Sequence, residues 1–291
     1  MMDILMESLT RRKEPVALLP RSYLFVPGRD AHRIGKALES AADAVVIDLE
    51  DAVAQEEKEA ARRVVKEVMR EKGSRPHVYV RINGLHSPFW QADCECAQEA
   101  GFAGIMVPKV GSAEDIVRLK RELTAEMTII PLIETARGVH FAYEIALADA
   151  AVTRLAFGAV DYSLDLGIAL TDEQLELVYP RSRLAVASRA AGIDPPIDTV
   201  FTDLNHEKGL IRETRMAKRL GFRGKLLIHP KQIQPVHTVF SPTKDELAWA
   251  QAVVEAFQAA EKQGVAAISV DGKMVDYPVY KHALTILAWQ K

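Results

Sequence analysis

The 291-residue chain lacks features that define several large classes of protein. It has only two cysteines, Cys94 and Cys96, whose C-x-C spacing is too close for an ordinary disulfide framework and insufficient alone for a zinc site. No long apolar run occurs, at the N-terminus or elsewhere, so we expect neither a signal peptide nor a membrane span and predict a cytoplasmic protein. A formal net charge of −3 gives no general attraction to nucleic acid or to an anionic membrane, and we predict neither as a partner.

Several catalytic and nucleotide-binding motifs are also missing. The sequence contains no G-x-S-x-G, H-E-x-x-H or P-loop pattern, and no G-x-G-x-x-G follows its first strand candidate. The last absence weighs against a dinucleotide-binding fold. Gly- or Pro-rich linkers and low-complexity tracts are absent, and the hydrophobic share of 48% is ordinary for a globular protein with a large core.

Apolar stretches alternate with helical patterns along most of the chain. Their average period of about 29 residues is close to what eight β/α units in roughly 250 residues require. Such alternation implies parallel strands with right-handed crossovers, and eight units favour a closed barrel. We predict a TIM (β/α)8 barrel over residues 21–240, preceded by a leader over 1–20. The eight strand candidates are residues 22–28, 44–51, 77–83, 104–110, 128–133, 154–162, 197–203 and 225–230.

The last 51 residues, 241–291, depart from the repeat. Thr243 and Glu246 fit a capping box that opens a long helix, which Gly264 ends. Residues 265–275 predict a small hairpin around Asp271–Gly272, and an amphipathic helix follows. A barrel does not need these elements, so this extension could cover the active site or reach a neighbouring subunit.

The stretch TIIPLIETARG, residues 128–138, organises the functional interpretation. Its apolar run predicts a strand buried on both faces, and the run ends on an acid, Glu134. The carboxyl ends of barrel strands converge on one face, where catalytic groups and metal ligands lie. Polar or chain-turning residues end the other strands too: Gly28, Arg29, Asp48, Glu50, Asp51, Arg81, Asn83, Lys109, Asp161, Asp203 and His229.

Glu134 and Asp161 come from strands five and six, which are adjacent in the predicted barrel. Two carboxylates, completed by water and substrate oxygens, suit Mg²⁺, which takes few protein ligands. The alternative is that Asp161 only caps the following turn. We favour a shared Mg²⁺ because unpaired acids that face each other would repel.

Arg81, at the end of strand three, is a candidate anion binder for a carboxylate or an enolate oxygen. Its alternative role is a salt bridge to Glu50 or Asp51, and both roles are compatible if the acids orient the guanidinium. We expect Asp48 to belong to the same orienting group. Lys109 could form a Schiff base, but a structural or electrostatic role is the stronger interpretation.

The helix after strand one begins with bases. Arg29, Arg33 and Lys36 are spaced to share one helical face. Bases oppose the helix dipole at this end, which favours an anion such as phosphate bound there. A solvated basic face is the alternative. At the other end of the chain, Asp276 lies two residues ahead of Pro278, as a helix N-cap would.

Seven motifs in this order resemble one family. SYLFVPG, AVVIDLEDAV, VRIN, VPKV, PLIETARG, FGAVDYSLDLG and GKLLIHPKQI are similar to the citrate lyase β-subunit-like enzymes of the HpcH/HpaI aldolase superfamily. The similarity covers about residues 20–285. It implies a Mg²⁺-dependent TIM barrel, usually a homotrimer, that makes or breaks a carbon–carbon bond between a 2-keto acid and an acyl thioester.

The resemblance also implies roles for single residues. Glu134 and Asp161 match the metal ligands, and Arg81 matches a substrate contact. Asp276 matches a catalytic acid/base that family members deliver from a neighbouring subunit. The positions that match contacts to CoA are Phe25, Lys36, Ile228 and His229. Phe25 stands where some relatives carry Tyr, and His32 where some carry Lys, which leaves the details of the CoA contact open.

These matches predict a carbon–carbon lyase that acts on a 3-hydroxyacyl-CoA. Citramalyl-CoA, giving pyruvate and acetyl-CoA, is the first expectation and malyl-CoA the second. The alternatives are a malyl-CoA thioesterase and a citrate lyase β subunit that acts on a carrier-protein thioester. A non-catalytic binding protein is the weakest alternative, because every matched catalytic position is occupied.

Overall fold

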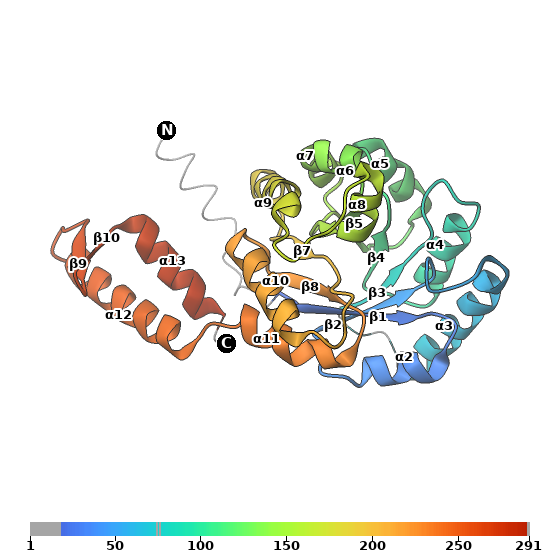
Figure 1. Cartoon of the computed structure of the whole chain (residues 1–291), viewed down its shortest axis with the longest axis horizontal. Coiled ribbons are helices and arrows are strands. Elements are labelled where there is room, and N and C mark those ends of the chain that lie inside the picture. Colours follow the sequence, from blue (N-terminus) through green and yellow to red (C-terminus); the bar gives the residue numbers. More distant parts are fainter. Residues whose placement is uncertain (1–18, 74, 76, 290–291) are drawn as a thin grey trace. The chain divides into compact units, whose positions relative to one another are not determined.

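The computed structural model describes residues 19–73, 75 and 77–289 (Figure 1). Most of the predicted leader, residues 1–18, therefore lies outside the described residues. Residues 20–240 form one compact unit, and residues 241 onwards belong to a second one. The two units are described separately below.

The first unit is a closed barrel of eight parallel strands, paired in chain order with β8 against β1. Helices cover the outside of the barrel (Figure 1). This architecture confirms the predicted TIM barrel. Its strands are β1 (Ser22–Pro27), β2 (Ala44–Asp48), β3 (Val78–Arg81), β4 (Gly104–Val107), β5 (Thr128–Ile133), β6 (Ala156–Phe157), β7 (Ile197–Asp198) and β8 (Gly224–Leu227).

The barrel helices follow the strands that they cover. They are α2 (Ala31–Leu38), α3 (Lys58–Lys72), α4 (Trp90–Glu99), α5 (Ala113–Glu122), α6 (Ala136–His140), α7 (Ala142–Leu147), α8 (Ala159–Leu166), α9 (Val178–Ala191), α10 (Glu207–Arg219) and α11 (Ile233–Phe240). Among the described residues, no helix is both long and apolar enough to cross a membrane.

Two separate apolar layers follow from the alternation of side chains along the strands. Tyr23, Val46, Met106 and Leu132 belong to a cluster that fills the barrel interior. Their chain neighbours face outward into a larger cluster between the strands and the helices. Every residue of β5 except its first, Thr128, is buried, as predicted for a strand covered on both faces.

Several strands are shorter than predicted, because the chain turns as soon as a strand reaches the barrel mouth. The Asp48 carboxylate accepts the backbone N–H groups of Glu50 and Ala52, which ends β2 three residues early. The predicted sixth strand is wrong beyond Phe157. Gly158 ends β6, and the next residues form α8, in which Ala159 and Tyr162 are buried at helical spacing.

The C-terminal unit contains α12 (Lys244–Glu261), a hairpin of β9 (Ile268–Val270) and β10 (Lys273–Val275), and α13 (Tyr277–Ala288). The capping box is confirmed: Thr243 and Glu246 exchange hydrogen bonds of 2.7 and 3.1 Å. The hairpin is confirmed as well, with Asp271 and Gly272 at φ of 49° and 74°. A small core of its own, which includes Val253, Phe257 and Ala283, holds this unit together.

Candidate active site

A cavity of about 480 Å³ opens where the barrel strands end. The residues that line it come from the ends of most strands, which is where TIM-barrel enzymes place their chemistry. The polar side chains around it are Asp48, Asp51, Arg81, Glu134, Asp161, Thr199 and Thr202. The apolar lining includes Phe25, Leu132, Val160 and Ile228.

Glu134 lies directly after β5 and is only 2% exposed. One carboxylate oxygen, Oε1, accepts the backbone N–H of Lys109 at 2.9 Å. Lys109 has a φ of 56°, a conformation that costs energy for a residue other than glycine and that turns this N–H toward the acid. Burial, followed by the negative charges of Asp161 and Glu50, raises the pKa of Glu134 to about 8.

Asp161 lies in the first turn of α8, so the prediction that it ends a strand is wrong. Its carboxylate lines the same cavity as Glu134 and is close enough to raise the pKa of Glu134. Gly158 occupies the N-cap position of α8, three residues before Asp161, so Asp161 is not the cap of this helix. Within the described part of the chain, Asp161 makes no hydrogen bond or ion pair.

Arg81, at the end of β3, is held by several acids. Its Nε and Nη2 donate to the two oxygens of Asp48 at 2.8 and 2.6 Å, and its Nη1 lies 2.9 Å from Glu50 Oε2. Asp51 accepts a longer bond of 3.4 Å. The salt bridges predicted with Glu50 and Asp51 are present, but the bidentate partner is Asp48. Burial lowers the pKa of the guanidinium, yet the charge of Asp48 and its hydrogen bonds outweigh burial and hold it above its usual range.

Hydrogen bonds to its backbone hold the loop after β2, which carries Glu50 and Asp51, in place. The buried Lys58 ammonium donates to the carbonyl oxygens of Leu49 and Glu50, both at 2.7 Å. Asn83 donates to the same Leu49 carbonyl at 2.9 Å and also bonds to Asp93. Asn83, predicted as a strand-end candidate, is therefore a buried brace and is not among the residues that line the cavity.

Lys109 is bound through its side chain as well as its backbone. Its Nζ donates to Glu50 Oε1 at 2.7 Å. Burial lowers the pKa of this ammonium, but the hydrogen bond and charge of Glu50 outweigh burial and raise the pKa above its ordinary value. A Schiff-base lysine needs the opposite shift. The geometry supports the electrostatic role of Lys109.

The basic start of α2 differs from the prediction. The helix begins at Ala31, so Arg29 precedes it and does not share a helical face with Arg33 and Lys36. Arg29 pairs with Glu57 at 3.0 Å. The N-cap is an acid, Asp30, which accepts the Arg33 backbone N–H where an anion would otherwise bind. The side chains of Arg33 and Lys36 are exposed and remain as candidates for an anion, and Arg33 also pairs with Asp30 at 3.1 Å.

Phe25 lies on β1 and Ile228 directly follows β8, the strand that pairs with β1, and both residues line the cavity. The Arg81 guanidinium lies over the Phe25 ring, 4.9 Å from its centroid. His229 does not line the cavity. Its Nδ1 accepts the Lys231 backbone N–H at 3.1 Å and caps the short helix Pro230–Gln232. Asp203 accepts the Asn205 N–H at 2.9 Å and acts as a turn cap.

Asp276 belongs to the C-terminal unit. Its carboxylate caps α13 by accepting the Val279 N–H at 3.3 Å. This is the capping role that its position ahead of Pro278 predicted. The catalytic role suggested by the family resemblance stays a prediction.

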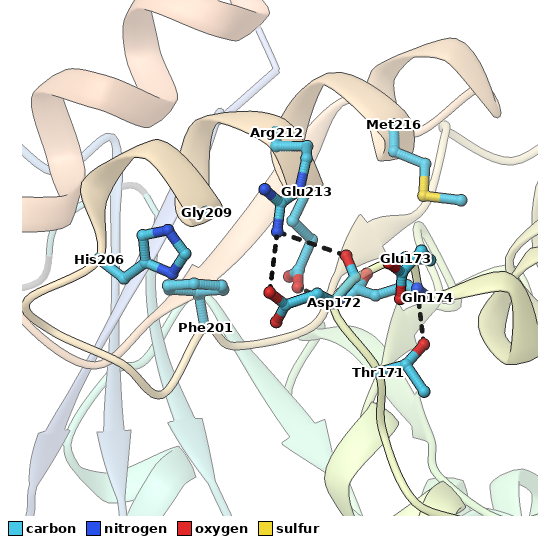
Figure 2. Close-up of a pocket in the computed structure, with 10 residues that line it drawn as sticks. All are labelled: Thr171, Asp172, Glu173, Gln174, Phe201, His206, Gly209, Arg212, Glu213 and Met216. Carbon is cyan, nitrogen blue, oxygen red and sulfur yellow. Dashed lines mark hydrogen bonds and ion pairs between the residues drawn. The ribbon is translucent and has the colours of Figure 1, made fainter.

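A second cavity, of about 310 Å³, was not predicted. It lies between the loop after α8 and helix α10, and Figure 2 shows Arg212 reaching Asp172 on its opposite side. A third cavity of about 210 Å³ shares lining residues with this one and with the catalytic cavity. Gln174, which has a φ of 53°, lines the second and third cavities. Its side-chain amide donates to Glu213 and accepts a hydrogen bond from Arg181.

Those two residues belong to a buried charge cluster that the sequence also gave no reason to expect. Arg181 Nε and Lys225 Nζ each lie 2.8 Å from one oxygen of Asp198, and Lys225 also bonds to Glu213. We call Arg181, Asp198, Glu213 and Lys225 the buried charge cluster. It joins α9, β7, α10 and β8, and its two positive charges balance its two negative charges.

The catalytic cavity has the chemistry of a divalent-cation site with few protein ligands. No group of three or more His, Cys, Asp or Glu side chains with metal-binding geometry occurs in residues 19–73, 75 and 77–289. Two carboxylates, Glu134 and Asp161, nevertheless line this cavity, and the charge of Asp161 adds to burial in raising the pKa of Glu134. Such a pair fits Mg²⁺, which keeps several waters, better than it fits Zn²⁺.

Known proteins resemble this chain along most of its length. The family model for HpcH/HpaI aldolase/citrate lyase matches residues 21–230. The chain is 36% identical over 279 residues to the citrate lyase subunit beta of Escherichia coli (strain K12), covering 92% of each chain. It is 36% identical over 258 residues to a (3S)-malyl-CoA thioesterase of Cereibacter sphaeroides, covering 88% and 89%. A mitochondrial citramalyl-CoA lyase of Rattus norvegicus is 32% identical over 290 residues, covering 92% and 85%.

Solved structures agree with the sequence matches. The protein CitE of Mycobacterium tuberculosis, in complex with magnesium, acetoacetate and coenzyme A, superposes with a TM-score of 0.80 at 33% identity. The match covers 94% of this chain and 99% of that one.

Proposed function

The chain belongs to the HpcH/HpaI aldolase/citrate lyase family, and on that premise we propose that it is a Mg²⁺-dependent carbon–carbon lyase for a 3-hydroxyacyl-CoA. The observation that carries the proposal is the placement of Glu134, Asp161 and Arg81 around one cavity at the barrel mouth. Citramalyl-CoA, cleaved to pyruvate and acetyl-CoA, is the first candidate substrate. The curated relatives that include a citramalyl-CoA lyase support it.

Glu134 and Asp161 would hold the Mg²⁺. When bound, Mg²⁺ acts as a Lewis acid that lowers the pKa of a substrate hydroxyl and neutralises a carboxylate. The first turn of α8 favours the negative charge of Asp161 through the helix dipole. The Lys109 N–H holds the Glu134 carboxylate in place, so little reorganisation is needed when the cation arrives.

Arg81 binds the oxygen on which negative charge develops. Asp48 accepts two of its five N–H groups and Asp51 accepts one, while Glu50 lies 2.9 Å from Nη1 as an ion-pair partner. One Nη2 N–H remains for the thioester enolate that carbon–carbon cleavage leaves behind. The acids fix the direction of this donor before the substrate arrives, which is the preorganisation that stabilises such an anion.

Asp276 acts as the general base that takes the proton from the substrate hydroxyl. We propose that it comes from a neighbouring subunit of a homotrimer. Exposed apolar side chains on α8 and around the start of α9 support an assembly: Leu164, Leu175 and Tyr179 are 80%, 74% and 66% exposed. The cytoplasmic location stays a prediction. Light scattering on wild type and on a Leu164→Glu, Leu175→Glu variant tests the assembly, and a monomeric wild type would contradict it.

CoA is placed over the β1 and β8 side of the mouth in this proposal. Phe25 and Ile228 line the cavity there, and Arg33 and Lys36 offer exposed charges for its phosphates. His229, although it lies next to Ile228 in the chain, is used as a helix cap in the free protein. A role for Arg29 is weaker than the sequence suggested, because Glu57 already pairs with it.

A panel of CoA esters tests the activity. The purified protein is incubated with Mg²⁺ and citramalyl-CoA, malyl-CoA or an unbranched 3-hydroxyacyl-CoA, and free keto acid and free thiol are measured separately. The proposal expects pyruvate and acetyl-CoA from citramalyl-CoA, without free thiol. Free thiol without keto acid would instead identify a thioesterase, which one relative's name makes the second candidate. Turnover only with a carrier-protein thioester would identify a citrate lyase β subunit.

A further inference from the structure

Helix α8, which carries Asp161, begins without a side-chain cap. Its N-cap residue is Gly158, and a glycine offers no oxygen to the free N–H groups of the first turn. The backbone of Gly158 does not require a glycine, because its φ is −110°. The space around Gly158, however, admits no side chain. A Cβ at this position would lie 2.5 Å from Glu134 Oε2 and 2.7 Å from Glu134 Cβ. The acid in the cavity therefore excludes the residues that normally cap a helix.

Thr199 supplies the missing cap from the next strand. Its Oγ1 accepts the backbone N–H of Ala159, the first residue of α8, at 2.9 Å. Thr199 directly follows β7 and is only 3% exposed, so no water replaces this bond. The hydroxyl thus fixes the start of α8, two residues before Asp161.

Asp165 fixes the same helix one turn after Asp161. Its Oδ2 accepts the backbone N–H of Ala136 at 2.7 Å. Ala136 lies two residues after Glu134 and begins α6. This bond ties the helix that carries one acid of the cavity to the segment that carries the other. Together, Thr199 and Asp165 hold α8 on both sides of Asp161.

We propose that Thr199 and Asp165 are positioning residues that hold Asp161 opposite Glu134 at the separation that a shared divalent cation requires. The inference rests on the proposed function, since it assumes that the two acids share the cation. Neither residue contacts the cation in this account. Each acts through the placement of α8.

The test measures Mn²⁺ binding to the metal-free protein by electron paramagnetic resonance, without substrate. Thr199→Val keeps the shape of the side chain and removes the acceptor. We expect it to weaken Mn²⁺ binding about 10-fold, the lower end of what loss of a supporting partner costs a metal site. Thr199→Ser keeps the hydroxyl and should bind Mn²⁺ within about twofold of wild type. Wild-type affinity in Thr199→Val would overturn the proposal for Thr199.

Asp165 offers an exposed second site in case Thr199→Val does not fold. Asp165→Asn keeps an acceptor oxygen but removes the charge, whereas Asp165→Ala removes both. Positioning predicts that Asn retains Mn²⁺ affinity and that Ala loses about threefold. Equal losses in the two variants would show that Asp165 acts through its charge, which contradicts a positioning role.

Two further measurements separate this inference from the proposed function and from a general loss of stability. Glu134→Gln should abolish Mn²⁺ binding at this site. If it binds as wild type does, the cation site itself is wrong. The melting temperature in EDTA reports stability. In Thr199→Val, the Mg²⁺ concentration for half-maximal turnover should rise about 10-fold while the KM for the CoA ester stays within twofold, a split that general destabilisation would not produce.

Discussion

The barrel unit contains two groups of charged side chains, one that joins β7 and β8 to α9 and α10 and one around the cavity where the strands end, and they are built differently. In the buried charge cluster each acid contacts a base. Around the catalytic cavity, Arg81 and Lys109 contact Asp48 and Glu50, so the positive charge is already used by acids other than Glu134 and Asp161. The first group is balanced, whereas the second has an excess of carboxylate.

The pKa values record this difference. Burial alone raises the pKa of an acid in both places. For Asp198 the charges of Arg181 and Lys225 outweigh burial, and its pKa lies below the ordinary value. For Glu134, Asp161 adds to burial and the pKa rises to about 8. Balanced charge thus joins secondary-structure elements, whereas the excess of carboxylate lies where we propose that a cation binds.

The largest fall in turnover is expected around the catalytic cavity, where carboxylates outnumber bases. Glu134→Gln or Asp161→Asn should lower turnover at least about 1,000-fold, because each removes a carboxylate that the cation needs. The melting temperature in EDTA should not fall, since either change removes repulsion between two acids. Steady-state assays measure the turnover, and thermal melts measure the melting temperature. Near-wild-type turnover in either variant would refute its assignment as a metal ligand.

Breaking the buried charge cluster should have the opposite result, a large loss of stability. Lys225→Met removes one of the two bases that pair with Asp198 and Glu213 in a buried place, and we expect the free energy of unfolding to fall by about 3–5 kcal/mol. Urea denaturation measures it. Arg212→Ala, which removes an exposed pair with Asp172, is the matched control and should change stability by less than about 0.5 kcal/mol. A loss as small as the control's for Lys225→Met would contradict a structural role for the cluster.

Substitution of Asp276 should lower both stability and turnover. Its Ala variant loses the cap of α13, which costs about 1 kcal/mol. As general base it should also lower turnover about 100-fold with the assembly intact. Light scattering confirms the assembly before kcat is compared. Asp276→Asn keeps the capping oxygen, so an Asn variant with normal turnover would leave Asp276 with its capping role only.

The smallest effect is expected at the exposed bases of α2. An Arg33→Ala, Lys36→Ala variant should raise the KM for a CoA ester about threefold at low salt and leave kcat unchanged, because exposed charges are screened. The effect should shrink at high salt. Arg29→Ala removes a base that precedes α2, and it serves as the control with a smaller expected change. A fall in kcat in the double variant would place these bases in the chemistry.

The sequence predicted the barrel well because eight apolar runs and the helices between them repeat regularly. It also placed Glu134 and Arg81 correctly, since both follow long runs that end at the barrel mouth. It misplaced Asp161, because the apolar pattern continues from β6 across Gly158 into α8. Gly158, directly after the strand, was the residue in the sequence that indicated the end of β6.

Other parts of the site depend on contacts that a single sequence does not show. The cap that Thr199 gives to α8 joins residues 40 positions apart in the chain, and no local motif marks it. The bidentate partner of Arg81 is Asp48 because β2 and β3 place the two side by side. Lys225 precedes an apolar run as a surface residue would, and only the folded barrel shows that it is buried.

The most direct test of the unbalanced cavity is a crystal structure of the protein soaked in Mn²⁺, with anomalous diffraction recorded for the metal. The account predicts one anomalous peak in the catalytic cavity, within about 2.3 Å of a carboxylate oxygen of both Glu134 and Asp161. It predicts no peak in the buried charge cluster. A catalytically active crystal with the metal bound elsewhere, or bound to only one of the two acids, would contradict it.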